Sequence, residues 1–137
     1  MYSKIMIPVD LRHTDDLNKA LSVAAEIAGS GGAELHMVGV TPSVPTEVAR
    51  SPEAYREKLA GFANGKSAEL GVTFEPHAEI SHDISVDLDD VLERTADKIG
   101  ADLIVMASHV PGFAERVFAS NAGYLASHSG LSVLVVR

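Results

Sequence analysis

The sequence predicts an α/β fold: a single, doubly wound parallel sheet of five strands with four helices. Two observations carry this prediction. Short runs that are apolar at every position, such as residues 103–107, are typical of strands buried on both faces. Segments with apolar residues at helical spacing, such as residues 17–28, alternate with these runs. Such alternation gives a parallel sheet with right-handed crossovers, and 137 residues suffice for one domain, residues 1–137.

Composition narrows the class of protein. The chain is 46% hydrophobic, has no cysteine and carries a formal net charge of −8. The negative charge disfavours nucleic acid and anionic membranes as partners, and no run of about 20 apolar residues is present to span a bilayer. The N-terminal apolar run, residues 5–9, is too short for a signal-peptide core. We expect a cytoplasmic protein without disulfides or a thiol catalyst.

The first strand and the first helix are predicted from the N-terminal residues. Residues 5–9 form a short apolar strand, which places Asp10 at its C-terminal tip. Thr14 and the two aspartates after it predict an N-cap and an acidic first turn for a helix that carries the apolar stripe 17–28. The glycine-rich residues 29–32 resemble a phosphate loop, but they follow a helix, so they predict a C-cap and turn.

The middle of the chain predicts a strand, a helix and an edge strand. Residues 33–40 form the second strand. Ser51, followed by a proline at the first helical position, begins a helix that ends near residue 70. Gly61 and Gly65 weaken this helix by about 1 kcal/mol each relative to alanine. Residues 72–80 alternate apolar and polar positions around a proline, which only an edge strand tolerates.

The C-terminal third completes the sheet. Asp87 is predicted to cap a third helix that closes at Gly100, and residues 103–107 form the fourth strand. A fourth helix opens at residue 120 or 121, and residues 133–136 form the fifth strand. With the third strand at one edge, the strand order is 3-2-1-4-5. The order reverses between strands 1 and 4, so the ligand crevice lies outside their C-terminal tips.

A phosphate-bearing ligand is predicted in that crevice, where Asp10 faces the loop 107–121. Its donors are the free amides of the fourth helix, the hydroxyls of Ser108 and Ser120, the Asn121 amide and His109 if protonated. Asp10 can hold a ribose hydroxyl or a nucleotide-bound Mg²⁺; the alternative is a structural acceptor at the entry to the first helix.

An adenine ring needs only apolar surface and main-chain polar groups. The residues placed to sandwich it are Pro8, Val9, Val40 and Val133. The alternative for each of these residues alone is a place in the ordinary core.

The last strand is predicted to be a dimer interface. The run Val133, Leu134, Val135 and Val136 forms a flat edge without proline or inward charge, which invites pairing with a second copy. We therefore expect a homodimer through antiparallel fifth strands; the alternative is that Arg137 and the loops block this edge.

The histidines predict no metal or catalytic site. His77, His82 and Asp83 have a spacing that fits no zinc pattern, and His128 is expected to be packed or solvated. No base is visibly paired with a nucleophile, so we predict no catalytic site; slow ATP hydrolysis is not required by any residue.

Taken together, these residues resemble the universal stress protein family, most closely its F/G-type branch. The match consists of residues 8–10, 105–109, Pro111, 120–122 and 132–137 at the family's spacing. The resemblance implies a five-stranded, Rossmann-like sheet of the adenine nucleotide alpha hydrolase type, dimers through the fifth strand, and ATP, AMP or another adenine nucleotide at the switch point.

The family's nucleotide motif, G-x2-G-x9-G-[S/T], is degenerate here. Met106, His109 and Ala119 occupy its glycine positions, or Ala107 and Val110 if the loop is shifted by one, and only Ser120 is retained. A Cβ hinders close approach to phosphate, although Gly112 can supply flexibility from a displaced position.

Two functions therefore stay open: a nucleotide-binding stress regulator that acts on a protein partner, and a dimeric interaction module that has lost nucleotide. A phosphoacceptor receiver would need a lysine ending the fifth strand. An adenylating enzyme would need a Ser-Gly-Gly loop where residues 10–12 stand.

Overall fold

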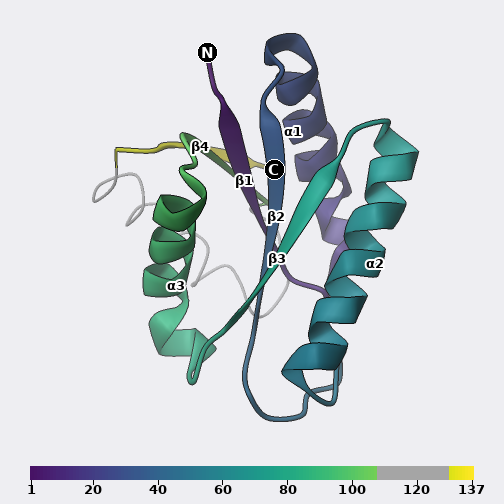
Figure 1. Cartoon of the computed structure of the whole chain (residues 1–137), viewed down its shortest axis with the longest axis vertical. Helices are drawn as coiled ribbons and strands as arrows, with labels where there is room; N and C mark the ends of the chain where they lie inside the picture. Colours follow the sequence, from purple (N-terminus) through teal and green to yellow (C-terminus); the bar gives the residue numbers. More distant parts are fainter. Residues whose placement is uncertain (108–129) are drawn as a thin grey trace.

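The computed structural model describes residues 1–107 and 130–137 (Figure 1). Its elements are, in chain order, β1 (Lys4–Val9), the 3-10 turn η1 (Thr14–Leu17), α1 (Asn18–Gly31), β2 (Glu34–Thr41), α2 (Pro52–Leu70), β3 (Phe74–Ile80), α3 (Ile84–Ile99), β4 (Leu103–Ala107) and β5 (Ser132–Val136). The fourth helix expected near residue 120 falls outside the described residues.

The five strands form one parallel sheet in the order β3-β2-β1-β4-β5. The predicted fold class and strand order are therefore confirmed. Helices α1 and α2 cover one face of the sheet, and α3 covers the other (Figure 1). The layers follow from period-2 alternation, because successive side chains of the central strands enter opposite cores.

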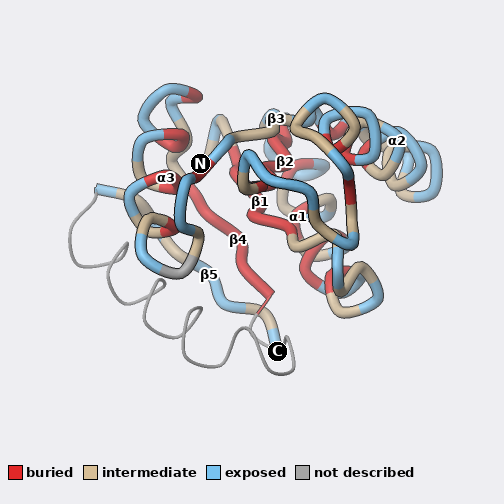
Figure 2. The backbone as a smooth tube through the Cα atoms, turned by 90° about the horizontal axis from the view of Figure 1, so that it is seen from below, coloured by how far each residue is buried: buried red, intermediate tan, exposed pale blue. Residues whose placement is uncertain are grey.

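Strands β1 and β4 are buried on both faces, as their continuous apolar runs predict. Ile5 and Ile7 pack against α1 and α2, whereas Met6 packs in the α3 core with Ile104 and Met106. Figure 2 shows β4 buried along its length between α3 and α1. Full burial of such a side chain contributes about 1.5–3 kcal/mol.

Two predicted helix starts are wrong. Thr14 does not cap α1: it opens the 3-10 turn η1, and the first α-helical residue is Asn18. Asp87 does not cap α3, which begins three residues earlier at Ile84. The main-chain carbonyl of Asp83 accepts hydrogen bonds from the N–H groups of residues 86 and 87, so the first turn forms before Asp87.

Other helix ends follow their sequence signals. The Ser51 side chain accepts a hydrogen bond from the Ala54 N–H at 3.1 Å, as an N-cap residue should. Gly32 adopts φ 71° and donates its N–H to the Ala28 carbonyl. Gly29, Ser30 and Gly31 still belong to α1, and Gly32 caps it, so this glycine-rich segment is a helix end, as predicted, and not a phosphate loop.

Helix α2 should gain stability from Gly61→Ala and Gly65→Ala. A Cβ at either position would meet nothing within 4 Å, and neither glycine has a positive φ. We expect each change to raise the free energy of unfolding by about 0.8–1 kcal/mol, measured by urea denaturation. A loss of stability in either variant would show that the helix needs the glycine.

The sheet edges are β3 and β5. Residues Glu75 and Pro76 of β3 are exposed, which agrees with the predicted edge position. In β5, Leu134 and Val135 are 36% and 43% exposed. Within residues 1–107 and 130–137, no helix combines the length and the apolar character that crossing a bilayer requires.

Candidate functional site

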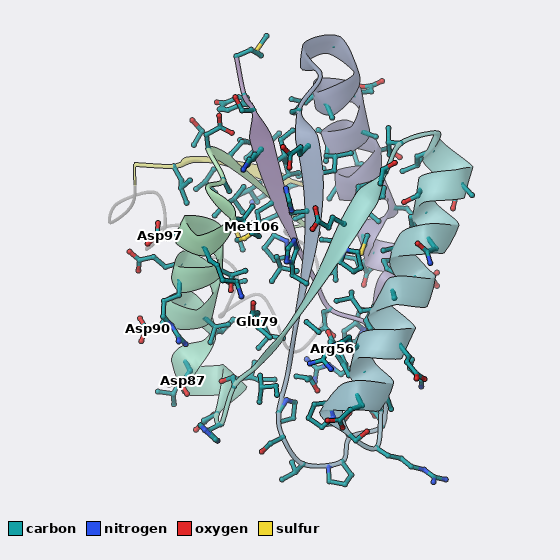
Figure 3. The ribbon with its side chains drawn as sticks, in the orientation of Figure 1. Arg56, Glu79, Asp87, Asp90, Asp97 and Met106 are labelled. Atoms are coloured by element: carbon teal, nitrogen blue, oxygen red, sulfur yellow. The ribbon has the colours of Figure 1, made fainter. Side chains whose placement is uncertain are left out.

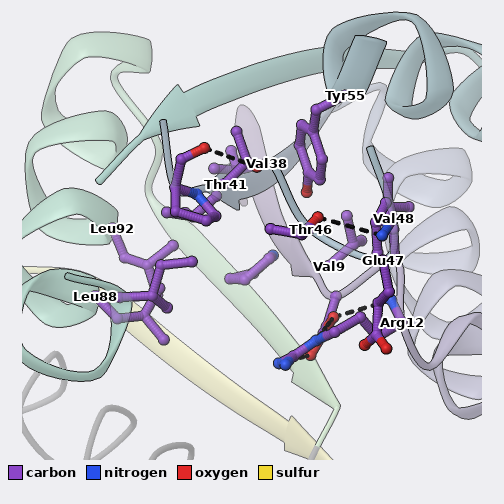
Figure 4. A pocket seen from close by; sticks show the side chains of 16 residues that line it. Val9, Arg12, Val38, Thr41, Thr46, Glu47, Val48, Tyr55, Leu88 and Leu92 are labelled. Atoms are coloured by element: carbon purple, nitrogen blue, oxygen red, sulfur yellow. Dashed lines mark hydrogen bonds and ion pairs between the residues drawn. The ribbon is translucent and has the colours of Figure 1, made fainter. Parts of the chain in front are cut away.

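A cavity of about 320 Å³ opens at the C-terminal ends of β1 and β2 (Figure 4). Four segments line it: the end of β1 and its turn (Pro8, Val9, Asp10, Leu11, Arg12), β2 and the residues after it (Val38, Val40, Thr41, Pro42, Thr46, Glu47, Val48), the start of α2 (Tyr55), and α3 (Ile84, Leu88, Leu92). Parallel sheets bind ligands at these carboxyl ends.

One side of the cavity is apolar. Leu88 and Leu92 project from α3 and pack with Val38 in the same core cluster, and Val40 is a partly buried neighbour of that cluster. Figure 4 shows the two leucines facing Thr46 and Val48 across the cavity. This geometry suits a flat, apolar ring, since small-molecule sites are mostly apolar with a few placed polar groups.

The opposite side is a turn held by its own hydrogen bonds. Thr46 Oγ1 accepts hydrogen bonds from the N–H groups of Val48 and Ala49, both at 3.2 Å. The Thr46 N–H in turn donates to the Ala49 carbonyl at 2.8 Å. These bonds give the segment 46–49 one shape, so it forms a preorganised wall.

Tyr55 closes the inner end of this wall. Its side chain is 4% exposed, and burial raises the pKa of the phenol, so it stays protonated at neutral pH. The ring lies directly over the backbone of Gly39: a Cβ there would overlap the phenol oxygen and lie 3.0 Å from Cζ. Position 39 therefore needs glycine, because the Tyr55 ring lies against the β2 backbone there.

Asp10 and Arg12 form an ion pair at the rim. Arg12 Nη2 donates to Asp10 Oδ2 at 2.9 Å and Arg12 Nε donates to Asp10 Oδ1 at 3.1 Å. The Arg12 main-chain N–H also donates to Oδ1, at 3.0 Å. The hydrogen bond to Asp10 raises the pKa of Arg12. The Asp10 side chain thus holds the turn after β1, whereas the structural alternative given for it was an acceptor at the entry to the first helix. A carboxylate retains further acceptor sites.

The predicted site residues divide into three groups. Four of them line the cavity together: Pro8, Val9, Asp10 and Val40. Three others are in strands but outside this lining: Met106 and Ala107 are buried in β4, and Val133 packs partly buried against the α3 core. The remaining six lie outside the described residues: Ser108, His109, Gly112, Ala119, Ser120 and Asn121.

Several residues that line the cavity were not predicted as site residues. Tyr55 and Leu88 fall within two of the predicted helices with no motif that marks them, and Arg12 and Thr46 have no motif around them either. They come from four separate segments that the parallel topology brings to one edge. The one sequence signal available for Arg12 was its position two residues after Asp10, within reach of a carboxylate at a strand tip.

The model of the universal stress protein family matches residues 1–137. The chain belongs to the universal stress protein family. It is 27% identical to universal stress protein G of Shigella flexneri over 143 residues, with both chains covered fully. This relative confirms the branch indicated by the C-terminal residues.

Solved universal stress proteins share this fold. One is a universal stress protein in complex with cAMP, with a TM-score of 0.70 and 21% identity over 99% of this chain and 97% of that one. Another, from Archaeoglobus fulgidus, is in complex with dAMP, with a TM-score of 0.66 and 22% identity over 99% and 98%.

Proposed function

We propose that this universal stress protein binds an adenine nucleotide in the cavity between β1, β2 and α3, and acts as a cytoplasmic stress-response regulator. The observation that carries the proposal is the cavity itself: about 320 Å³, apolar on the α3 side and polar at the rim. The complexes of family members with cAMP and dAMP support the ligand class. The absence of cysteine from the sequence supports the proposed cytoplasmic location.

In this proposal the adenine ring lies between Val9, Val40 and Leu88, and main-chain groups contact its edge. The ribose and phosphate lie toward the rim. Asp10 accepts from a ribose hydroxyl, and the Arg12 guanidinium binds a phosphate oxygen. The sequence predicts further donors for this ligand at Ser108, His109, Ser120 and Asn121, which lie outside the described residues.

The charges at the rim favour a nucleotide with few phosphates. The Arg12 guanidinium pairs with both oxygens of Asp10, so a Mg²⁺ on Asp10 would lie beside a second positive charge. A monophosphate needs no such ion. We propose AMP or a cyclic monophosphate as the preferred ligand, with ATP and Mg²⁺ weaker.

Titration calorimetry with AMP, cAMP, ATP and ATP with Mg²⁺ tests this proposal, with GMP as the control for base selectivity. Binding of AMP at micromolar affinity should stabilise the folded chain by about 2.7 kcal/mol at a hundredfold excess over Kd, visible as a rise in Tm. Neither heat nor a Tm shift with any adenine nucleotide would reject the proposal and favour the interaction module.

A second proposed property is a homodimer through β5. An unidentified protein partner would recognise the surface of this dimer. The supporting observation is the exposed Leu134 and Val135 on an edge strand. Leu134→Glu should convert a dimer to a monomer in light scattering, whereas Val86→Glu, at a 72% exposed residue of α3, should not. A monomeric wild type at micromolar concentration would remove this proposal.

A further inference from the structure

Two histidines and two glutamates meet on adjacent strands, away from the nucleotide cavity. The β2–β3 register pairs His36 with Glu75 and Val38 with His77. Glu34 precedes His36 by two residues, so period-2 alternation puts all four side chains on the α3 face of the sheet. We call Glu34, His36, Glu75 and His77 the β2–β3 histidine cluster; none of them lines the cavity.

The ligating atoms of this cluster converge on one point. His36 Nδ1 lies 2.8 Å from His77 Nε2 and 3.5 Å from Glu75 Oε2. One ligand atom from each of His36, Glu75 and His77 can be chosen so that all three lie within 4.8 Å of one another. Two nitrogens bound to one tetrahedral Zn²⁺ are roughly 3.3 Å apart, since each Zn–N bond is about 2.0–2.1 Å. The two imidazole nitrogens need to separate by only about half an ångström.

The fourth member orients the central ring. His36 Nε2 lies 3.0 Å from Glu34 Oε1, and an ionised carboxylate can only accept, so Nε2 carries a hydrogen. The Nδ1 lone pair of the neutral ring then points toward His77 and Glu75. A carboxylate that fixes the tautomer of a ligating histidine is the usual outer shell of a zinc site.

The exposure of these residues also suits a metal site. His36 is buried, with a side chain 7% exposed, whereas the Glu75 side chain is 61% exposed. One ligand is thus held inside the fold, while another lies at the surface and leaves an entry path. Burial lowers the pKa of His77, which favours its neutral form.

Within residues 1–107 and 130–137, the cation that acts on the cluster is paired elsewhere. Lys98 of α3 is close enough to act on His77, but its ammonium lies 2.8 Å from Glu79 Oε1. Figure 3 shows Glu79 on β3, on the side of α3. The two cluster glutamates therefore face two imidazoles in a chain of net charge −8, an environment that attracts a divalent cation.

From this geometry we infer that the β2–β3 histidine cluster binds one Zn²⁺ through His36 Nδ1, His77 Nε2 and the Glu75 carboxylate, with Glu34 orienting His36. Nitrogen and carboxylate ligands in a tetrahedral arrangement favour zinc over Mg²⁺ or Ca²⁺, which take oxygen ligands in larger numbers. Water fills the fourth position. In binding, the cation replaces the hydrogen bond between the two rings, and His77 carries its hydrogen on Nδ1 instead.

Calorimetric titration of the full, chelator-treated chain with ZnCl₂ tests the inference. We expect one Zn²⁺ per chain, with at least a tenfold loss of affinity in both His77→Ala and Glu75→Gln. Glu34→Gln should lower affinity by about 10- to 100-fold. His82→Ala removes another exposed imidazole, and Glu79→Gln removes the next carboxylate on the same face of β3; both controls should bind as the wild type does.

Titration with Co²⁺ gives a second readout, because a tetrahedral site produces intense visible absorption and an octahedral one does not. Glu75 is exposed, so Glu75→Gln keeps the fold testable, and circular dichroism verifies it. The inference is overturned if the wild type binds no stoichiometric Zn²⁺, or if either His77→Ala or Glu75→Gln retains wild-type affinity. The proposed nucleotide site contains none of the cluster residues. A failure to bind zinc would therefore leave the nucleotide proposal standing, and a failure to bind nucleotide would leave the zinc proposal standing.

Discussion

Val40→Trp is expected to lower the affinity for AMP by at least roughly a hundredfold. Val40 lines the cavity beside Val38 and is only partly buried, so an indole at this position would take up the volume proposed for the adenine ring. Nucleotide sites bury most of their ligand, and a bulky side chain inside such a site therefore acts by exclusion. Titration calorimetry with AMP measures the effect.

The matched control for this change is Val44→Trp. Val44 lies three residues after β2, is 61% exposed and does not line the cavity, so the same substitution there should leave AMP affinity within about twofold of the wild type. The Tm of each variant without nucleotide verifies folding. A folded Val40→Trp variant with unchanged affinity would place the nucleotide elsewhere.

Gly39→Ala is expected to destabilise the chain by about 1–3 kcal/mol. The added Cβ would overlap the Tyr55 phenol oxygen and lie 3.1 Å from Cε1. Tyr55 is 4% exposed and packs in the core between the sheet and α2, so displacing its ring would disturb that packing. Urea denaturation measures the loss, and weaker AMP binding should accompany it because Tyr55 lines the cavity.

A double-mutant cycle identifies the cause of this loss. In a Tyr55→Phe background the atom nearest the new Cβ is absent, so the same glycine substitution should cost less than in the wild type. Gly29→Ala is the control, since a Cβ at this helical position meets nothing within 4 Å. Equal penalties in both backgrounds would mean that the ring is not the obstacle at position 39.

The sequence predicted four residues that line the cavity, all at or next to strand tips, and missed lining residues from other segments. Pro8, Val9, Asp10 and Val40 end two strands of a parallel sheet, and topology alone places such residues at one edge. Thr46 lies in a loop whose path depends on packing. Tyr55 lies in α2, where its periodic position indicates burial but not a place beside a cavity. The cluster of His36 and His77 was missed for a related reason: its members lie 41 residues apart, and only strand register brings them together.

The strand order and the alternation of helices were readable from the chain because each rests on a local cause: apolar runs, proline positions and caps that act within a few residues. The helix starts at Asn18 and Ile84 could not be read from the chain. Hydrogen bonds in the preceding loops compete there with a nearby capping side chain. The shape of the cavity, the Asp10–Arg12 pair and the β2–β3 histidine cluster arise from contacts between separate segments. Such contacts depend on distance in space, and a linear pattern does not encode that distance.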